Sequence, residues 1–143
     1  MMNSYGLEFH HFGLAVRSPE AAFRYLKDLG YREGSSCYDP LQKVNLAMRH
    51  HDQMPDVEVI WPGREPSPID RMLKNSDSMI YHLCYTSKNV AASLSALELA
   101  GLEVLPLSMP QPALLFGCLE VSFYNITGVG IIEVIAGNPE LKN

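Results

Sequence analysis

One short stretch occurs twice in this sequence and decides the fold: FHHFGLAV at residues 9–16 and IYHLCYTS at residues 80–87. In each copy the residues alternate between two faces, which is the period-two pattern of a β-strand. His11 in the first copy and His82 in the second share their strand face with small residues. A strand that lines a cavity needs such a face, because a bulky neighbour would fill the space above the imidazole.

The similarity between the two halves continues beyond these strands at the same sequence offset. Each strand is followed by an amphipathic helical pattern that ends at a glycine, Gly30 or Gly101, where a positive φ suits a helix C-terminus. Ser18 before Pro19 predicts the N-cap and first residue of the first helix, and Asn89 predicts the N-cap of the second. We therefore interpret the sequence as an internal duplication.

Three short strands are expected after each helix, because runs of β-branched and aromatic residues alternate there with turn signals. They are predicted near residues 31–38, 44–49 and 57–61 in the first half, and near residues 103–107, 119–124 and 130–135 in the second. Each half then has the order βαβββ. We expect one domain over residues 1–143, made of modules 9–61 and 79–136.

Residues 62–78 are the predicted linker between the two modules. Within it, Ser67, Pro68 and Asp70 have the N-cap, N1 and N3 pattern of a short helix. In the second half, the segment 106–117 contains several prolines and is predicted to be a loop, a candidate lid for a cavity.

The composition is that of an ordinary globular domain, with 47% hydrophobic and 19% charged residues. A net charge of −5 without a Lys/Arg cluster gives no support for a nucleic-acid partner. No apolar run reaches the length of a membrane span, and the first residues lack a secretory signal pattern. Three cysteines without a C-x-x-C pair favour reduced thiols and a cytoplasmic location.

A second pairing, at a slightly larger offset, places a glutamate in the last strand of each half. These are Glu58 in the run VEVI and Glu133 in the run IEVI. A carboxylate inside an apolar strand is costly to bury unless it is paired, hydrogen-bonded or bound to a metal. The increase in offset between the histidine strands and the glutamate strands indicates an insertion in the second half, most simply around residues 106–117.

One histidine and one glutamate in each half make a workable ligand set for one divalent metal: His11, Glu58, His82 and Glu133. Imidazole suits Zn, Ni, Co and Fe, and carboxylate suits harder ions such as Mn. A single histidine or glutamate in a strand is most often structural or solvent-facing, so the coincidence of four at repeat-matched positions favours the metal site. His50 and His51 have no counterpart in the second half and are interpreted as loop residues, with the alternative that either one reaches the mouth of the cavity.

These residues resemble the vicinal oxygen chelate superfamily, which includes glyoxalase I, methylmalonyl-CoA epimerase, extradiol dioxygenases and bleomycin resistance proteins. The resemblance covers about residues 9–135. It implies an α+β fold in which two βαβββ modules form a cupped, mixed eight-stranded sheet around one divalent metal. It also implies that the metal ligands are His11, Glu58, His82 and Glu133. A homodimer is expected from the resemblance, and the sequence leaves open whether the two halves close the site within one chain or across the dimer.

Two segments look closest to methylmalonyl-CoA epimerase-type members: PGREPSPIDRML at residues 62–73 and GVGIIEV at residues 128–134. The sequence departs from that type at two positions. Epimerases usually have Gln where this chain has Glu58, whereas bacterial-type glyoxalase I has Glu. They also carry a second catalytic Glu in the third strand of the first module, where the alignment gives Asn45. Because epimerisation uses two proton-transferring groups, Asn45 weighs against that reaction.

By this resemblance we expect a metal-dependent lyase or isomerase, glyoxalase I-like or epimerase-like, acting on a small oxo-acid, thioester or thiol adduct. The metal would stabilise an enediolate as a Lewis acid while Glu133 moves the proton. Two alternatives stay open. A non-heme iron dioxygenase usually has two His and one carboxylate as ligands, and a non-catalytic small-molecule binding or resistance protein generally lacks the ligand set.

Overall fold

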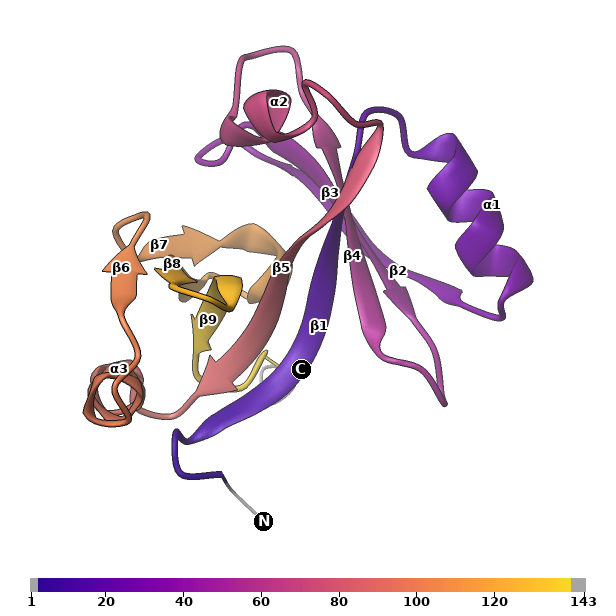
Figure 1. Ribbon diagram of the computed structural model, residues 1–143. Helices are drawn as coiled ribbons and strands as arrows, with labels where there is room; N and C mark the ends of the chain where they lie inside the picture. The colour runs from indigo at the N-terminus through magenta and orange to yellow at the C-terminus, as the bar shows by residue number, and fades with distance from the viewer. Residues whose placement is uncertain (1–2, 140–143) are drawn as a thin grey trace. The chain divides into compact units, whose positions relative to one another are not determined.

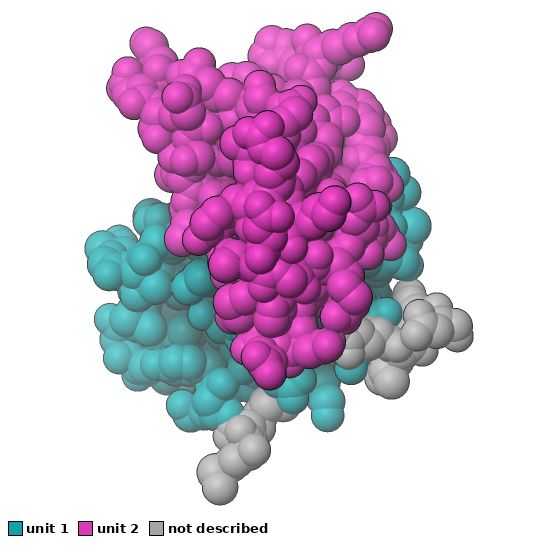
Figure 2. Space-filling view, turned by 90° about the vertical axis from the view of Figure 1, so that its right-hand side faces the viewer, with its two compact units in different colours: residues 1–10, 82–143 teal, residues 11–81 magenta. Residues whose placement is uncertain are grey.

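A computed structural model describes residues 3–139 and confirms the α+β class. The chain divides into two compact units: unit 1 comprises residues 1–10 and 82–143, and unit 2 comprises residues 11–81 (Figure 2). The boundaries fall inside the two histidine-bearing strands, β1 (Leu7–Val16) and β5 (Ser78–Ser87).

Unit 2 contains the first βαβββ copy. After β1, its elements are α1 (Glu20–Asp28), β2 (Arg32–Asp39), β3 (Val44–His50), β4 (Asp56–Pro62) and the short helix α2 (Pro68–Met72). The strands pair in the order β2–β3–β4–β1, with β1 and β4 parallel and the other pairs antiparallel. Helix α1 covers one face of these strands (Figure 1), where Leu26 packs with Val57 and Val59.

Unit 1 contains the second copy. After β5, its elements are α3 (Val90–Leu99), β6 (Val104–Pro106), β7 (Gln111–Ala113), a 3-10 turn (Leu114–Phe116), β8 (Leu119–Ile126) and β9 (Gly130–Ala136). Strands β5 and β9 are parallel, β8 and β9 are antiparallel, and both β6 and β7 pair with β8. Leu97 of α3 packs with Tyr124, Ile132 and Val134 in the core of this unit.

The two halves pair their strands in the same register around each glutamate. In unit 2, Met48 on β3 lies opposite Glu58 on β4. In unit 1, Phe123 on β8 lies opposite Glu133 on β9. The offset from Met48 to Phe123 equals the offset from Glu58 to Glu133. Because a slip of one residue would turn every side chain to the other face, the shared register confirms the duplication predicted from the sequence.

The second half contains a strand that the sequence did not predict. The expectation of a loop throughout residues 106–117 is wrong, because β7 lies within it; the described residues therefore form nine strands and not eight. Strands β6 and β7 occupy the edge that β2 alone occupies in unit 2. The segment that connects β6 to β7 contains Pro110. Because proline has no N–H to donate, the ladder is interrupted there. Leu107 N donates to Phe123 O at 2.8 Å, and Phe123 N donates to Ser108 Oγ at 3.2 Å.

The insertion in the second half is also distributed differently from our expectation. Arg32 and Leu105 hold equivalent edge positions, opposite His50 and Asn125 respectively. The offset between Arg32 and Leu105 already exceeds the offset that relates the two preceding helical segments. Part of the insertion therefore precedes β6 and does not belong to the segment 106–117.

The two principal helices begin differently. The prediction of a Ser18 cap is wrong, because α1 has Pro19 at its N-cap and no side-chain capping bond. The Asn89 cap of α3 is confirmed, since its Oδ1 accepts a hydrogen bond from Ala92 N at 3.0 Å.

Over residues 3–139, no helix has the length and hydrophobicity that crossing a bilayer would require.

The linker is held by local contacts within unit 2. Ser67 and Asp70 form the expected capping box at the start of α2. Arg17, at the end of β1, forms an ion pair with Asp77 at 3.3 Å. Its guanidinium also donates to the carbonyl oxygens of Leu73, Lys74 and Ser76. These bonds occupy carbonyls that follow the short helix α2, so the end of the linker is attached to the end of β1.

Candidate metal-binding site

In unit 2, His11 and Glu58 lie on one face of the sheet. Gly13 is the β1 residue paired with Glu58, and His11 is two residues before it on the same face. The His11 Nε2 is 3.7 Å from the Glu58 Oε1, and the two side chains are 0% and 3% exposed. Because Gly13 has no side chain, β1 leaves space beside the imidazole.

In unit 1, His82 and Glu133 repeat this arrangement. Cys84 is the β5 residue paired with Glu133, and His82 is two residues before it on the same face. The His82 Nε2 is 3.3 Å from the Glu133 Oε1, and the side chains are 1% and 3% exposed. Phe123, opposite Glu133, also makes an edge-to-face contact with the His82 ring at 5.4 Å. The four residues predicted from the sequence thus form two matched pairs, one in each unit.

The geometry of each pair suits ligands of a common cation. Separations of 3.3 Å and 3.7 Å are longer than the roughly 2.7–2.9 Å of a charge-assisted hydrogen bond. Two ligands with metal bonds of about 2.0–2.2 Å at a tetrahedral angle lie roughly 3.4 Å apart. A carboxylate as buried as Glu58 or Glu133 needs such a charge partner. Each pair can therefore supply two ligands to a divalent ion.

A protein-family model described as the Glyoxalase/Bleomycin resistance protein/Dioxygenase superfamily matches residues 10–115. The chain belongs to this superfamily. The matched segment includes His11, Glu58 and His82 but ends before Glu133. No curated protein matches the chain in a sequence search.

Several solved structures share the fold of this chain. Methylmalonyl-CoA epimerase from Mycobacterium tuberculosis matches with a TM-score of 0.79 and 19% identity, covering 99% of this chain and 95% of that chain. A hypothetical protein from Bacillus halodurans C-125 matches with a TM-score of 0.76 and 19% identity, covering 92% and 95%. Streptomyces coelicolor methylmalonyl-CoA epimerase in complex with 2-nitronate-propionyl-CoA matches with a TM-score of 0.71 and 17% identity, covering 90% and 95%. At these identities, the likeness establishes the fold alone.

Within this superfamily fold, Asn45 does not face the glutamate. It pairs with Trp61, so strand alternation places it on the opposite side of β3, where its amide donates to Pro62 O at 3.2 Å. The β3 residue opposite Glu58 is Met48, which is 3% exposed. Asn45 therefore lies on the face of the sheet that does not carry Glu58. The position that faces Glu58 holds an apolar side chain that carries no proton.

Sequence reasoning missed a polar pair on the same face. His50 and Asp56 lie across β3 and β4, two residues along each strand from Met48 and Glu58. The His50 Nδ1 is 2.9 Å from the Asp56 Oδ2, and the side chains are 39% and 26% exposed. Gly34 makes room for this ring, since a Cβ there would overlap the His50 Nε2. An imidazole oriented by a carboxylate is typical of general acid–base groups.

The signal for this pair was the alternation of the strands. Counting back by two from Glu58 gives Asp56, and the register of the hairpin then gives His50. The expectation that His50 is a loop residue is wrong, because β3 continues to it. His51 does lie in the loop, where its Nδ1 accepts hydrogen bonds from Gln53 N and Met54 N.

Cys37, on β2, lies on the same face of the sheet, opposite Leu46. Burial raises the pKa of the Cys37 thiol, and the nearby carboxylates of Asp39 and Glu58 raise it further. The thiol is therefore protonated at neutral pH. A protonated thiol is a poor nucleophile, so Cys37 is not a candidate catalytic residue.

Proposed function

We propose that this superfamily member is a metal-dependent lyase or isomerase of the glyoxalase/epimerase type. In this proposal, a single divalent metal is held by His11, Glu58, His82 and Glu133. The observation that carries it is the buried His–Glu pair that both units repeat in the same register. Membership of a superfamily that includes glyoxalases supports it.

One shared ion is favoured over two separate ions because of the ligand count. Each pair offers two protein ligands, whereas metal sites in proteins ordinarily use three or four. Two neutral imidazoles and two carboxylates would also balance the charge of a dication, which lowers the cost of burying it. The donor set is compatible with Zn, Ni, Co, Mn and Fe.

When bound, the ion would act as a Lewis acid toward a substrate carbonyl or two vicinal oxygens. Glu133 is the proposed base that removes a proton from the carbon beside that carbonyl. Phe123, 8% exposed and opposite Glu133 in the ladder, keeps water from one side of the carboxylate. A small oxo-acid, thioester or thiol adduct meets the requirement for such an acidic C–H bond.

His50 is the proposed second proton carrier. Asp56 holds its ring through Nδ1, which leaves Nε2 as the atom that exchanges a proton with substrate. Met48 holds the position opposite Glu58 and has no proton to give. In an isomerisation, Glu133 takes a proton from carbon and His50 delivers one elsewhere on the substrate. The cycle balances when Glu133 then releases its proton to solvent and His50 takes one up before the next turnover.

The test is an assay of metal-loaded protein with two substrates. The first is the hemithioacetal that glutathione forms with methylglyoxal, and the second is methylmalonyl-CoA. We expect turnover of one of them that is lost with a chelator and restored by a divalent metal. Glu133→Gln should lower turnover at least about 100-fold. The matched control is Glu120→Gln, an exposed glutamate on β8 that should have no effect.

Two results would count against the proposal. One is turnover that a chelator does not affect. The other is metal-loaded protein that turns over neither substrate. Oxygen consumption by the iron-loaded protein would instead select the dioxygenase alternative.

A further inference from the structure

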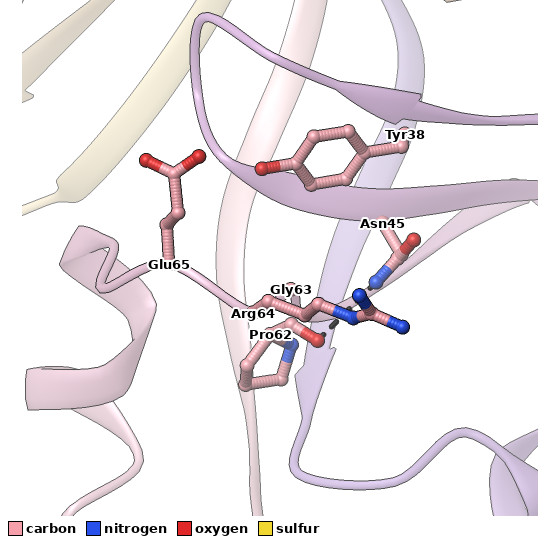
Figure 3. Close-up of a pocket in the computed structure, with 6 residues that line it drawn as sticks. All are labelled: Tyr38, Asn45, Pro62, Gly63, Arg64 and Glu65. Carbon is pink, nitrogen blue, oxygen red and sulfur yellow. Dashed lines mark hydrogen bonds between the residues drawn. The ribbon is translucent and has the colours of Figure 1, made fainter.

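Unit 2 contains a pocket of about 540 Å³ at the ends of strands β2, β3 and β4. It is lined by Tyr38, Asn45, Pro62, Gly63, Arg64 and Glu65 (Figure 3). This volume is within the range of about 300–1,000 Å³ that small-molecule sites occupy. None of the four proposed metal ligands is among the lining residues.

The pocket lies on the opposite face of the sheet from His11 and Glu58. Tyr38 and Asn45 are ladder partners, and Asn45 is also opposite Trp61, whose ring packs on Phe23 of α1 at 5.6 Å. The pocket therefore belongs to the helix-covered face, beyond the part that α1 covers. A ligand bound there would be separated from the His11–Glu58 pair by the sheet itself.

Gly63 gives the pocket its shape. A Cβ at this position would lie 2.7 Å from the Tyr38 Cε2 and 3.3 Å from Lys43 O. Only glycine therefore lets the Tyr38 ring lie directly against the main chain that follows β4. The ring is held as one wall, and Tyr38 is nevertheless 40% exposed.

The duplication provides an internal control for these residues. The ladder pair equivalent to Tyr38 and Asn45 is Pro112 and Glu120 in unit 1. Unit 1 thus builds the same hairpin with neither a phenol nor an amide at these positions. The fold does not require Tyr38 and Asn45, so their presence in unit 2 calls for another explanation.

Among the described residues around the pocket, the charge of Arg64 is not offset by an ion pair. Lys43 Nζ is 3.3 Å from the Glu65 Oε2, so these two charges offset one another. Arg64 has no ion pair or hydrogen bond with any residue between 3 and 139. A guanidinium in this state can bind a carboxylate or phosphate through two parallel hydrogen bonds.

We propose that this pocket is a second ligand site, which binds a small oxyanion carried on a flat aromatic body. Arg64 binds the carboxylate or phosphate ester, and the Tyr38 ring and Pro62 contact the flat apolar part (Figure 3). Asn45 donates to Pro62 O and so fixes the floor of the pocket. The site is independent of the metal-binding residues and of the proposed reaction.

The test uses Trp61, the only tryptophan of the chain, as a built-in reporter beside Asn45. Chelator-treated full-length protein is titrated with benzoate, phenyl phosphate, inorganic phosphate and the neutral analogue benzamide, and tryptophan emission is recorded. We expect saturable changes with benzoate or phenyl phosphate, and affinity at least about tenfold weaker for benzamide. The ratio of the two anions distinguishes a carboxylate ligand from a phosphate ester.

Variants assign the binding to the pocket. Arg64→Gln should weaken binding of the anions about tenfold, and Arg71→Gln, an exposed arginine outside the pocket, should not. Gly63→Ala should also weaken anion binding, because the added Cβ displaces the Tyr38 ring. Since this variant is strained, a second measurement uses the wild type and follows the amide chemical shifts of Asn45 during the titration. Absence of saturable binding by both methods would overturn the proposal, as would equal affinity in Arg64→Gln. Neither result depends on metal content or on turnover.

Discussion

The two halves of the molecule carry the same residue types at one position of their strand ladders and different residue types at the neighbouring position. Both carry a buried His–Glu pair in the same register. Two residues away along the paired strands, unit 2 has the hydrogen-bonded pair His50–Asp56. The equivalent ladder partners in unit 1 are Asn125 and Ile131. A requirement of the fold would act on both copies, since the hairpins pair identically. The difference therefore separates the residues proposed as metal ligands, which both units carry, from the His50–Asp56 pair, which is present in unit 2 alone.

The largest expected effect distinguishes the two glutamates. Replacing either by Gln keeps an oxygen ligand, but only Glu133 is proposed to move the proton. We expect Glu133→Gln to lower kcat by about 10²–10⁴ and Glu58→Gln by about tenfold or less. The measurement is kcat at saturating metal, with bound metal determined in each variant. Equal losses in both variants would mean that the roles of the two glutamates are not divided in this way.

His50→Asn gives unit 2 the residue that unit 1 has at the equivalent position, Asn125. We expect kcat to fall about 10- to 100-fold with little change in stability, because the ring is partly exposed and general acid–base groups contribute on this scale. The control is His51→Asn, which removes loop hydrogen bonds and should lower the unfolding midpoint without a comparable loss of kcat. Unchanged kcat in His50→Asn would contradict the proton-carrier role.

The helix starts provide a smaller contrast. Asn89→Ala removes the bond from Ala92 N and should cost about 1 kcal/mol of unfolding free energy. Ser18→Ala removes no capping bond and should stay within about 0.5 kcal/mol. Urea unfolding of both variants measures the difference. A larger loss for Ser18→Ala would show that Ser18 does cap α1 in solution.

The smallest effect concerns thiol reactivity. Cys118 is exposed, Cys37 is half-buried and Cys84 is buried. With iodoacetamide near neutral pH, Cys118 should be alkylated several-fold faster than the others. Because the pKa of Cys37 is raised above 9.0, its rate should still be increasing with pH beyond that value. Peptide mapping by mass spectrometry measures each site, and equal rates at Cys37 and Cys118 would contradict this order.

Much of the fold could be predicted because the duplication supplies each assignment twice. A histidine strand, a helix ended by glycine and a glutamate strand recur at matching spacings, and the ladder registers agree with them. The His–Glu pairs could be predicted for the same reason, since burial of a carboxylate is costly and happens at equivalent positions. The single domain of residues 1–143, the homodimer and the cytoplasmic location stay predictions.

The features that could not be predicted from the sequence have a common cause: the sequence of one strand does not reveal which residues it pairs with. Only the hairpin register shows that Met48 faces Glu58 and that Asn45 lies on the other face of the sheet. His50 was assigned to a loop because the end of β3 depends on its pairing with neighbouring strands. Strand β7 contains Pro112 and forms because the edge of β8 offers it a partner. Local sequence patterns do not contain this information.

Metal content is the most direct test of the central claim that both units supply ligands to one ion. The measurement is elemental analysis of protein reconstituted with a divalent metal, for the wild type, Glu58→Ala and Glu133→Ala. We predict about one ion per chain in the wild type and a strong loss in each variant, because each removes one of four ligands. Two ions per chain, no bound ion, or full occupancy in either variant would contradict the claim.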